Sequence, residues 1–134
     1  MEIIYSLKEI KNIAKYILST TNKKIFFLNG IIGVGKTTLV KELVLQLGST
    51  DIVSSPTYNI INKYKTNNHN IFHIDLYRIK SLQEILNIGI EEYLFLNNYC
   101  FIEWSNFLDK WLKLPKVDIK IFHKKEYRKI VISN

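Results

Sequence analysis

Residues 30–37 read G-I-I-G-V-G-K-T, the spacing of glycine, lysine and threonine that is typical of a phosphate-binding loop. Before the loop, Ile25 to Leu28 form a short continuous apolar run, which predicts a strand buried on both faces. From Lys36 on, apolar residues recur at helical spacing until Gly48, which is a natural helix stop. The loop therefore lies between a buried strand and a helix N-terminus, which is the context expected of a working loop.

The residue types in this loop suit the phosphates of a nucleotide. A helix N-terminus offers free N–H groups and the positive end of the helix dipole, and glycines let the backbone come close to the phosphates. Lys36 can reach the β- and γ-phosphate oxygens, and the hydroxyl of Thr37 can ligate Mg²⁺. Thr38 is expected to face the α-phosphate or to pack. The loop predicts binding of ATP or GTP with Mg²⁺.

Two acidic residues follow predicted strands. Asp75 comes after the apolar run 71–74, and Glu103 comes after the run 99–102. Because ligands bind at the carboxyl edge of an open α/β sheet, both carboxylates are expected beside the loop, where they could hold Mg²⁺ and position water. Thr57 precedes a predicted strand and is a candidate for a switch-loop hydroxyl that senses the γ-phosphate and the metal.

The sequence indicates the base of the nucleotide only through the guanine-binding motifs that it lacks. A Ras-like GTPase would carry N-K-x-D, but residues 62–65 read N-K-Y-K and lack the aspartate. The second switch of such a GTPase would read D-x-x-G, whereas residues 75–78 read D-L-Y-R. These differences favour ATP.

The remaining patterns predict alternating helices and strands. Helices are expected over 7–19, 36–47, 81–89, 91–96 and 107–112, and strands over 25–28, 58–64, 71–74, 99–103, 117–122 and 128–132. Two pairs of these strands are expected to form hairpins. The sum is an α/β three-layer sandwich resembling P-loop NTPases, with a mostly parallel central sheet and antiparallel additions, formed by residues 1–134 as a single domain.

Composition limits the function classes further. The 134 residues are 47% hydrophobic and contain one cysteine, Cys100, which excludes an internal disulfide and is expected to be a small buried hydrophobe. Neither a membrane span nor a signal peptide is recognisable, so a cytoplasmic protein is expected. The net charge of +7 suits a polyanionic partner such as RNA. A composition rich in Ile, Asn and Lys, with the lysines scattered along the chain, explains the charge as well.

Several short motifs beyond the loop occur in a characteristic order. They are G-x-x-G-x-G-K-T-T at 30–38, S-P-T-Y at 55–58, H-x-D-L-Y-R at 73–78, G-I-E-E-Y at 89–93 and E-W at 103–104. Over nearly the whole chain, this series resembles the TsaE (YjeE) family, the small bacterial ATPases of tRNA threonylcarbamoyladenosine (t6A) biosynthesis.

The resemblance implies a P-loop α/β fold that binds ATP and Mg²⁺ and hydrolyses ATP slowly when alone. It also implies association with the TsaD and TsaB proteins, and a role in modifying adenosine 37 of tRNAs that read A-starting codons. The chain would then reach tRNA indirectly, through this complex.

The resemblance also assigns site residues. Those that would hold the phosphates are Gly33, Val34, Gly35, Lys36, Thr37 and Thr38. Thr37 and Glu103 would hold Mg²⁺, with Asp75 close to the metal or its water. Thr57 would be the switch residue, and Trp104 would lie beside the site. Together with Lys36, the residues Thr57, Asp75 and Glu103 form the expected catalytic set.

The contacts to the base are expected from the N-terminal segment 6–10 and from a C-terminal arginine, for which Ile10 and Arg128 are the nearest matches. Ile10 stands where the family often has a threonine, and Ile31 stands in the loop where the family often has an acidic or polar residue. His73 alternates with core residues in its strand and is expected to be structural or to support the site from behind.

Two other functions remain open at this point. A small-molecule kinase would usually bring an arginine-rich lid over the phosphates, whereas this chain has only Arg78 and Arg128. A basic RNA-binding module with a vestigial ATP site would fit the charge. Because P-loop enzymes often need an arginine finger, the scarcity of arginine predicts low intrinsic turnover and activation by a partner.

Overall fold

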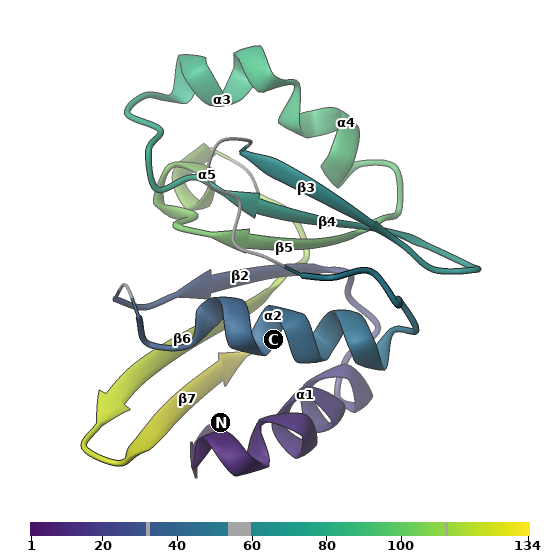
Figure 1. The fold of residues 1–134 in the computed structure, drawn as a ribbon. Helices are drawn as coiled ribbons and strands as arrows, with labels where there is room; N and C mark the ends of the chain where they lie inside the picture. The colour runs from purple at the N-terminus through teal and green to yellow at the C-terminus, as the bar shows by residue number, and fades with distance from the viewer. Residues whose placement is uncertain (32, 54–59, 112) are drawn as a thin grey trace.

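A seven-stranded mixed sheet forms the centre of the computed structural model, which describes residues 1–31, 33–53, 60–111 and 113–134 (Figure 1). Its strands are β1 (Glu2–Tyr5), β2 (Ile25–Asn29), β3 (Ile61–Lys65), β4 (Asn70–Asp75), β5 (Tyr99–Glu103), β6 (Val117–Lys124) and β7 (Tyr127–Ser133). The helices are η1 (Leu7–Glu9), α1 (Ile10–Ser19), α2 (Lys36–Gln46), α3 (Leu82–Ile88), α4 (Ile90–Leu94) and α5 (Asn106–Trp111).

The strand order is β1-β7-β6-β2-β5-β4-β3. The four central strands β6, β2, β5 and β4 run parallel to one another, while β3, β7 and β1 add antiparallel pairs at the two sides. The predicted parallel sheet with antiparallel additions is confirmed, and so are both predicted hairpins, β3–β4 and β6–β7. The parallel core brings the carboxyl ends of β2, β4 and β5 to one edge of the sheet.

The two faces of the sheet are covered by different helices, which confirms the three-layer arrangement. One hydrophobic cluster joins α1 and α2 to the sheet through side chains such as Ile17, Leu43 and Phe101. The other joins α3, α4 and α5 to the opposite face, with Ile85 and Leu108 fully buried. Figure 1 shows α2 lying along β2, which carries the glycine loop into this helix.

The N-terminal strand β1 is an element that the sequence pattern did not predict. Its four residues alternate too briefly to stand out, and the strand exists because it pairs with β7 from the far end of the chain. The helix expected over 7–19 begins as the short 3-10 helix η1 and becomes α-helical at Ile10. The strand expected over 58–64 is observed as β3, Ile61–Lys65; Ile60 is a bend before it, and residues 54–59 lie outside the described part of the chain.

Cys100 lies on β5 and is fully buried, as expected of a small hydrophobic residue. Burial raises the pKa of its thiol to about 12, so the reactive thiolate is disfavoured. Among the described residues, no helix combines the length and the apolar character that crossing a membrane requires.

Candidate functional site

The glycine loop connects the end of β2 to the first residue of α2, as predicted. Gly33 and Gly35 have φ angles of +81° and +112°, values that L-residues with a side chain rarely adopt. Gly35 is also the N-cap of α2, so the loop ends where the free N–H groups of the helix begin. The local sequence therefore builds an anion-binding helix N-terminus.

Gly30 meets a different constraint, which is the close approach of strand β6. A Cβ atom at this position would lie 2.8 Å from the backbone oxygen of Ile121 and 2.8 Å from Cγ1 of Val34. The start of the loop is thus pressed against β6.

Replacing Gly30 with alanine is expected to lower the free energy of unfolding by about 1–3 kcal/mol, because backbone atoms must shift to admit the methyl group. Urea unfolding followed by circular dichroism measures this. Gly48→Ala is the matched control, because its φ of +101° is also positive but no heavy atom lies within 4 Å of the added Cβ. If both variants lost the same stability, the close approach at Gly30 would not matter.

A cavity of about 330 Å³ lies beside the loop. It is lined by Gly33, Gly35, Lys36, Thr37, Thr38, Asp75, Tyr77, Glu103 and Trp104. Asp75 and Glu103 are register partners at the ends of the parallel strands β4 and β5, which explains why they meet here. The structure thus gathers two predicted acids, the loop lysine and both threonines around one hollow.

Lys36 points into this group and is only 5% exposed. Its ammonium donates a hydrogen bond to the carbonyl oxygen of Gly30 and lies 3.8 Å from the ring centre of Trp104. Burial lowers the pKa of Lys36, while the charges of Glu103 and Asp75 act in the opposite direction. The carboxylates thereby help keep the ammonium charged for binding an anion.

Asp75 is half-buried, and burial raises the pKa of its carboxyl group. The backbone N–H of Tyr77 donates to Oδ1 of Asp75 at 2.9 Å and lowers this pKa, whereas the neighbouring charge of Glu103 raises it again. Two carboxylates that destabilise each other in a buried place form a site at which a divalent cation relieves the repulsion.

The donor set fits Mg²⁺ better than a transition metal. Within the described ranges, no group of three or more His, Cys, Asp or Glu side chains is arranged to hold an ion. Mg²⁺ characteristically uses one or two carboxylates and completes its shell with phosphate oxygens and water. The carboxylates of Asp75 and Glu103 and the hydroxyl of Thr37 match that requirement in chemistry and in number.

Glu103 is held by His73, which was expected to be structural or to support the site from behind. Nε2 of His73 lies 2.5 Å from Oε2 of Glu103, and both residues are buried. Nδ1 of His73 has no partner among the described residues, so the proton belongs on Nε2, which donates to the carboxylate. Alternation along β4 indicated that His73 faces inward, but not that it reaches β5.

Trp104 adopts a φ of +59°, which is unusual for a bulky residue. Its ring packs against Tyr77 with centroids 4.9 Å apart and also covers the ammonium of Lys36. Tyr77, whose place in the site was not predicted, is 54% exposed and forms the outer wall. Strain of this kind tends to occur at functional sites, where the surroundings impose it.

The remaining predicted site residues lie at different places relative to the glycine loop. Arg128 on β7 reaches the loop, and its Nε donates to the carbonyl oxygen of Val34 at 2.9 Å. Ile10, the first residue of α1, is buried in the core and does not line the cavity at the loop. Ile31 is 64% exposed. Thr57 lies outside the described residues.

A glycine loop between a buried parallel strand and a helix, with acids at the ends of the next two parallel strands on one side, β5 and β4, defines a P-loop α/β protein. Residues 4–131 match the protein family described as "Threonylcarbamoyl adenosine biosynthesis protein TsaE". The chain belongs to this family, and its role accordingly lies in the t6A modification of tRNA.

Similar proteins carry the same description. The chain is 39% identical over 121 residues to "tRNA threonylcarbamoyladenosine biosynthesis protein TsaE" of Rickettsia bellii, which covers 89% of this chain and 83% of the relative. The TsaE protein of Bacillus subtilis is 33% identical over 115 residues, with 85% and 72% covered. The crystal structure of Bacillus subtilis YdiB aligns with a TM-score of 0.74 and 27% identity over 97% of this chain and 83% of YdiB.

Proposed function

We propose that the chain binds ATP with Mg²⁺ at the glycine loop and hydrolyses it slowly in support of t6A formation. The observation that carries this proposal is the single cavity shared by the loop, Lys36 and the two carboxylates Asp75 and Glu103. Bound Mg²⁺ would neutralise charge on the phosphates. The fit of the donor set to that ion supports its assignment.

Each part of the site has a proposed task. The backbone from Gly33 to Thr38 cradles the phosphates, and Lys36 neutralises them from within the cavity. Glu103 and Thr37 hold the metal, with Asp75 close to it or to its water. Thr57 is retained as the proposed switch residue.

Base recognition is proposed to involve Arg128 and the N-terminal segment around Ile10. Arg128 already lies against the loop through Val34, which is consistent with a place near the nucleotide. Ile10, being buried in the core, could offer only apolar contact. The absence of guanine motifs still favours ATP over GTP.

Turnover by the isolated chain should be low. Arg128 is engaged with the carbonyl oxygen of Val34, and Arg78 is exposed and does not line the described cavity. No arginine is therefore poised to stabilise charge in the transition state, and a partner would have to supply or position one. We propose that the partners are TsaB and TsaD, that the chain acts as one domain in the cytoplasm, and that it meets tRNA in their complex.

Titration calorimetry with Mg²⁺ and a non-hydrolysable ATP analogue tests the binding step, and release of phosphate tests turnover. We expect saturable binding, no competition from GTP at equal concentration, and turnover that rises at least tenfold when TsaB and TsaD are added. Failure to bind the analogue would refute the nucleotide site. Rapid turnover by the isolated chain would refute activation by the partners but would leave the nucleotide site in place.

A further inference from the structure

Each of the two carboxylates at the glycine loop has one oxygen engaged by the protein itself. Oε2 of Glu103 accepts the hydrogen bond from Nε2 of His73 at 2.5 Å. Oδ1 of Asp75 accepts from the backbone N–H of Tyr77 at 2.9 Å. These donors leave Oε1 of Glu103 and Oδ2 of Asp75 as the oxygens available to a cation, so each carboxylate can offer a metal ion one oxygen.

The hydrogen bond between His73 and Glu103 is fixed by the sheet. Asp75 and Glu103 are register partners on β4 and β5, and alternate residues of a strand face the same side. His73 therefore shares a face with both acids, and its side chain and that of Glu103 are buried there. If Oε2 turned away to a metal ion, the buried N–H of His73 would lose its acceptor, which is unfavourable.

Mg²⁺ and Ca²⁺ make different demands on carboxylates. Mg²⁺ prefers a small octahedral shell, in which one or two carboxylates are completed by phosphate oxygens and water. Ca²⁺ is larger, takes up to about eight oxygens and often binds both oxygens of one carboxylate. A site whose carboxylates each offer one oxygen therefore suits Mg²⁺ and leaves Ca²⁺ short of the ligands that it prefers.

We propose that His73 is a specificity-determining residue, which makes the metal site favour Mg²⁺ over Ca²⁺ by keeping Oε2 of Glu103 engaged. The inference rests on the proposed function, in which Mg²⁺ and ATP bind at the glycine loop, and it names the residue that sets the choice of ion. His73 acts through Glu103, as partners that orient a metal ligand do elsewhere. The backbone N–H of Tyr77 imposes the same restriction on Asp75.

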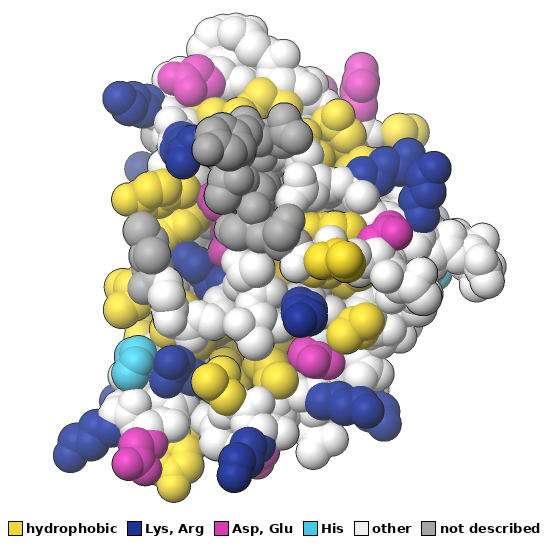
Figure 2. Space-filling view, in the orientation of Figure 1, with side chains coloured by type: hydrophobic (Ala, Val, Ile, Leu, Met, Phe, Trp, Pro, Cys, Tyr) yellow, Lys and Arg dark blue, Asp and Glu magenta, His cyan; other side chains and the backbone are white. Residues whose placement is uncertain are grey.

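The acidic side chains elsewhere on the molecule do not form a competing ion site in the part of the chain that the structure describes. Figure 2 shows Asp and Glu side chains spread over one face and interspersed with Lys and Arg. No group of three or more described His, Cys, Asp or Glu residues could hold an ion. A change in metal preference after substitution of His73 can therefore be attributed to the nucleotide site.

The test is the affinity of the full-length chain for a non-hydrolysable ATP analogue, measured by titration calorimetry in excess Mg²⁺, in excess Ca²⁺ and with a chelator. The wild type should bind roughly tenfold or more tightly with Mg²⁺ than with Ca²⁺. In His73→Leu, which removes the donor, this ratio should fall by roughly tenfold, because Glu103 is then free to offer both oxygens. Binding in the presence of the chelator should be unchanged.

Two amide variants separate the hydrogen bond from the loss of the imidazole ring. The amide nitrogen of glutamine can take the place of Nε2, whereas that of asparagine reaches only as far as Nδ1. His73→Gln should keep the ratio of the wild type, and His73→Asn should lose it. This pair carries the test if His73→Leu fails to fold. Ile71→Val, a buried change on the same face of β4, controls for a small loss of stability and should keep the ratio.

The possible failures are distinguishable. A wild type without preference for Mg²⁺ would overturn the inference, and so would a preference that His73→Leu and His73→Asn retain. Equal weakening under all three conditions would overturn it too, because His73 would then only shape the cavity. If the wild type did not bind the analogue under any condition, the proposed nucleotide site itself would be refuted, and this inference with it.

Discussion

Replacing Lys36 with methionine is expected to weaken binding of Mg-ATP by roughly 100-fold. Among the residues that the structure describes, Lys36 is the only lysine that lines the cavity at the loop. Two charge-assisted hydrogen bonds to phosphate oxygens are worth about 3 kcal/mol in a buried place, and each 1.4 kcal/mol is tenfold in affinity. Titration calorimetry with a non-hydrolysable ATP analogue gives the dissociation constant.

The same variant is expected to lose some stability, by about 1–3 kcal/mol, because the carbonyl oxygen of Gly30 loses its donor and the carboxylates of Asp75 and Glu103 lose a nearby positive charge. Methionine keeps the unbranched shape of the side chain, and circular dichroism at the temperature of the titration verifies that the variant is folded. Lys41→Met is the matched control, since Lys41 is exposed on the same helix, α2. If Lys36→Met bound the analogue as tightly as this control, the loop would not act through its lysine.

The parts of the site that the sequence predicted are those encoded locally. The glycine positions, the helix that begins at Lys36 and the strands that end at Asp75 and Glu103 each depend on a few neighbouring residues. Parallel pairing then brings those strand ends together by a general rule of α/β sheets. The cavity could therefore be predicted before its geometry was known.

The parts that were not predicted depend on contacts between distant segments. β1 is a strand because β7 pairs with it, and the reach of His73 to Glu103 depends on the register of β4 against β5. The left-handed conformation of Trp104 has no sequence signature in a residue of this type. In the same way, Lys120, Lys124 and Lys129 come together only after β6 and β7 have paired.

Ile10 illustrates how two sequence arguments can compete. Helical spacing with Ala14 and Ile17 predicted a buried position, whereas the family resemblance placed it near the base. All three side chains are in the core, which confirms the prediction from spacing. Its contact with the nucleotide remains a prediction.

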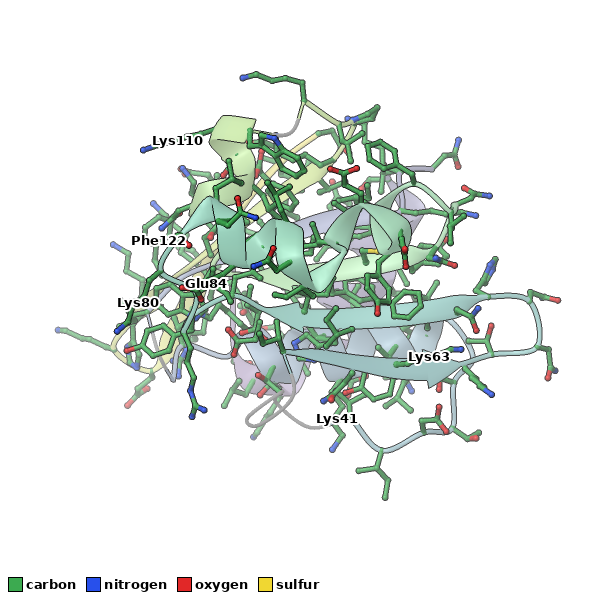
Figure 3. All side chains as sticks on the ribbon, turned by 90° about the horizontal axis from the view of Figure 1, so that it is seen from above. Lys41, Lys63, Lys80, Glu84, Lys110 and Phe122 are labelled. Atoms are coloured by element: carbon green, nitrogen blue, oxygen red, sulfur yellow. The ribbon has the colours of Figure 1, made fainter. Side chains whose placement is uncertain are left out.

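Replacing Glu103 with glutamine is expected to lower turnover by roughly 100-fold, equivalent to about 3 kcal/mol in the barrier. The amide can still accept the hydrogen bond from Nε2 of His73, so the side chain keeps its place, but it no longer offers a charged oxygen to Mg²⁺. Phosphate release by the chain with TsaB and TsaD measures the loss. Glu84→Gln, an exposed change on α3 labelled in Figure 3, is the control and should turn over normally.

A second readout separates the metal from the nucleotide. Without Mg²⁺, Glu103→Gln should bind ATP at least as tightly as the wild type, because one negative charge facing the phosphates has been removed. With Mg²⁺, the gain in affinity that the metal gives the wild type should shrink by tenfold or more. Weak binding under both conditions would mean that the carboxylate supports the cavity rather than the ion. Unchanged turnover would instead leave Asp75, its register partner on β4, as the residue that holds the metal.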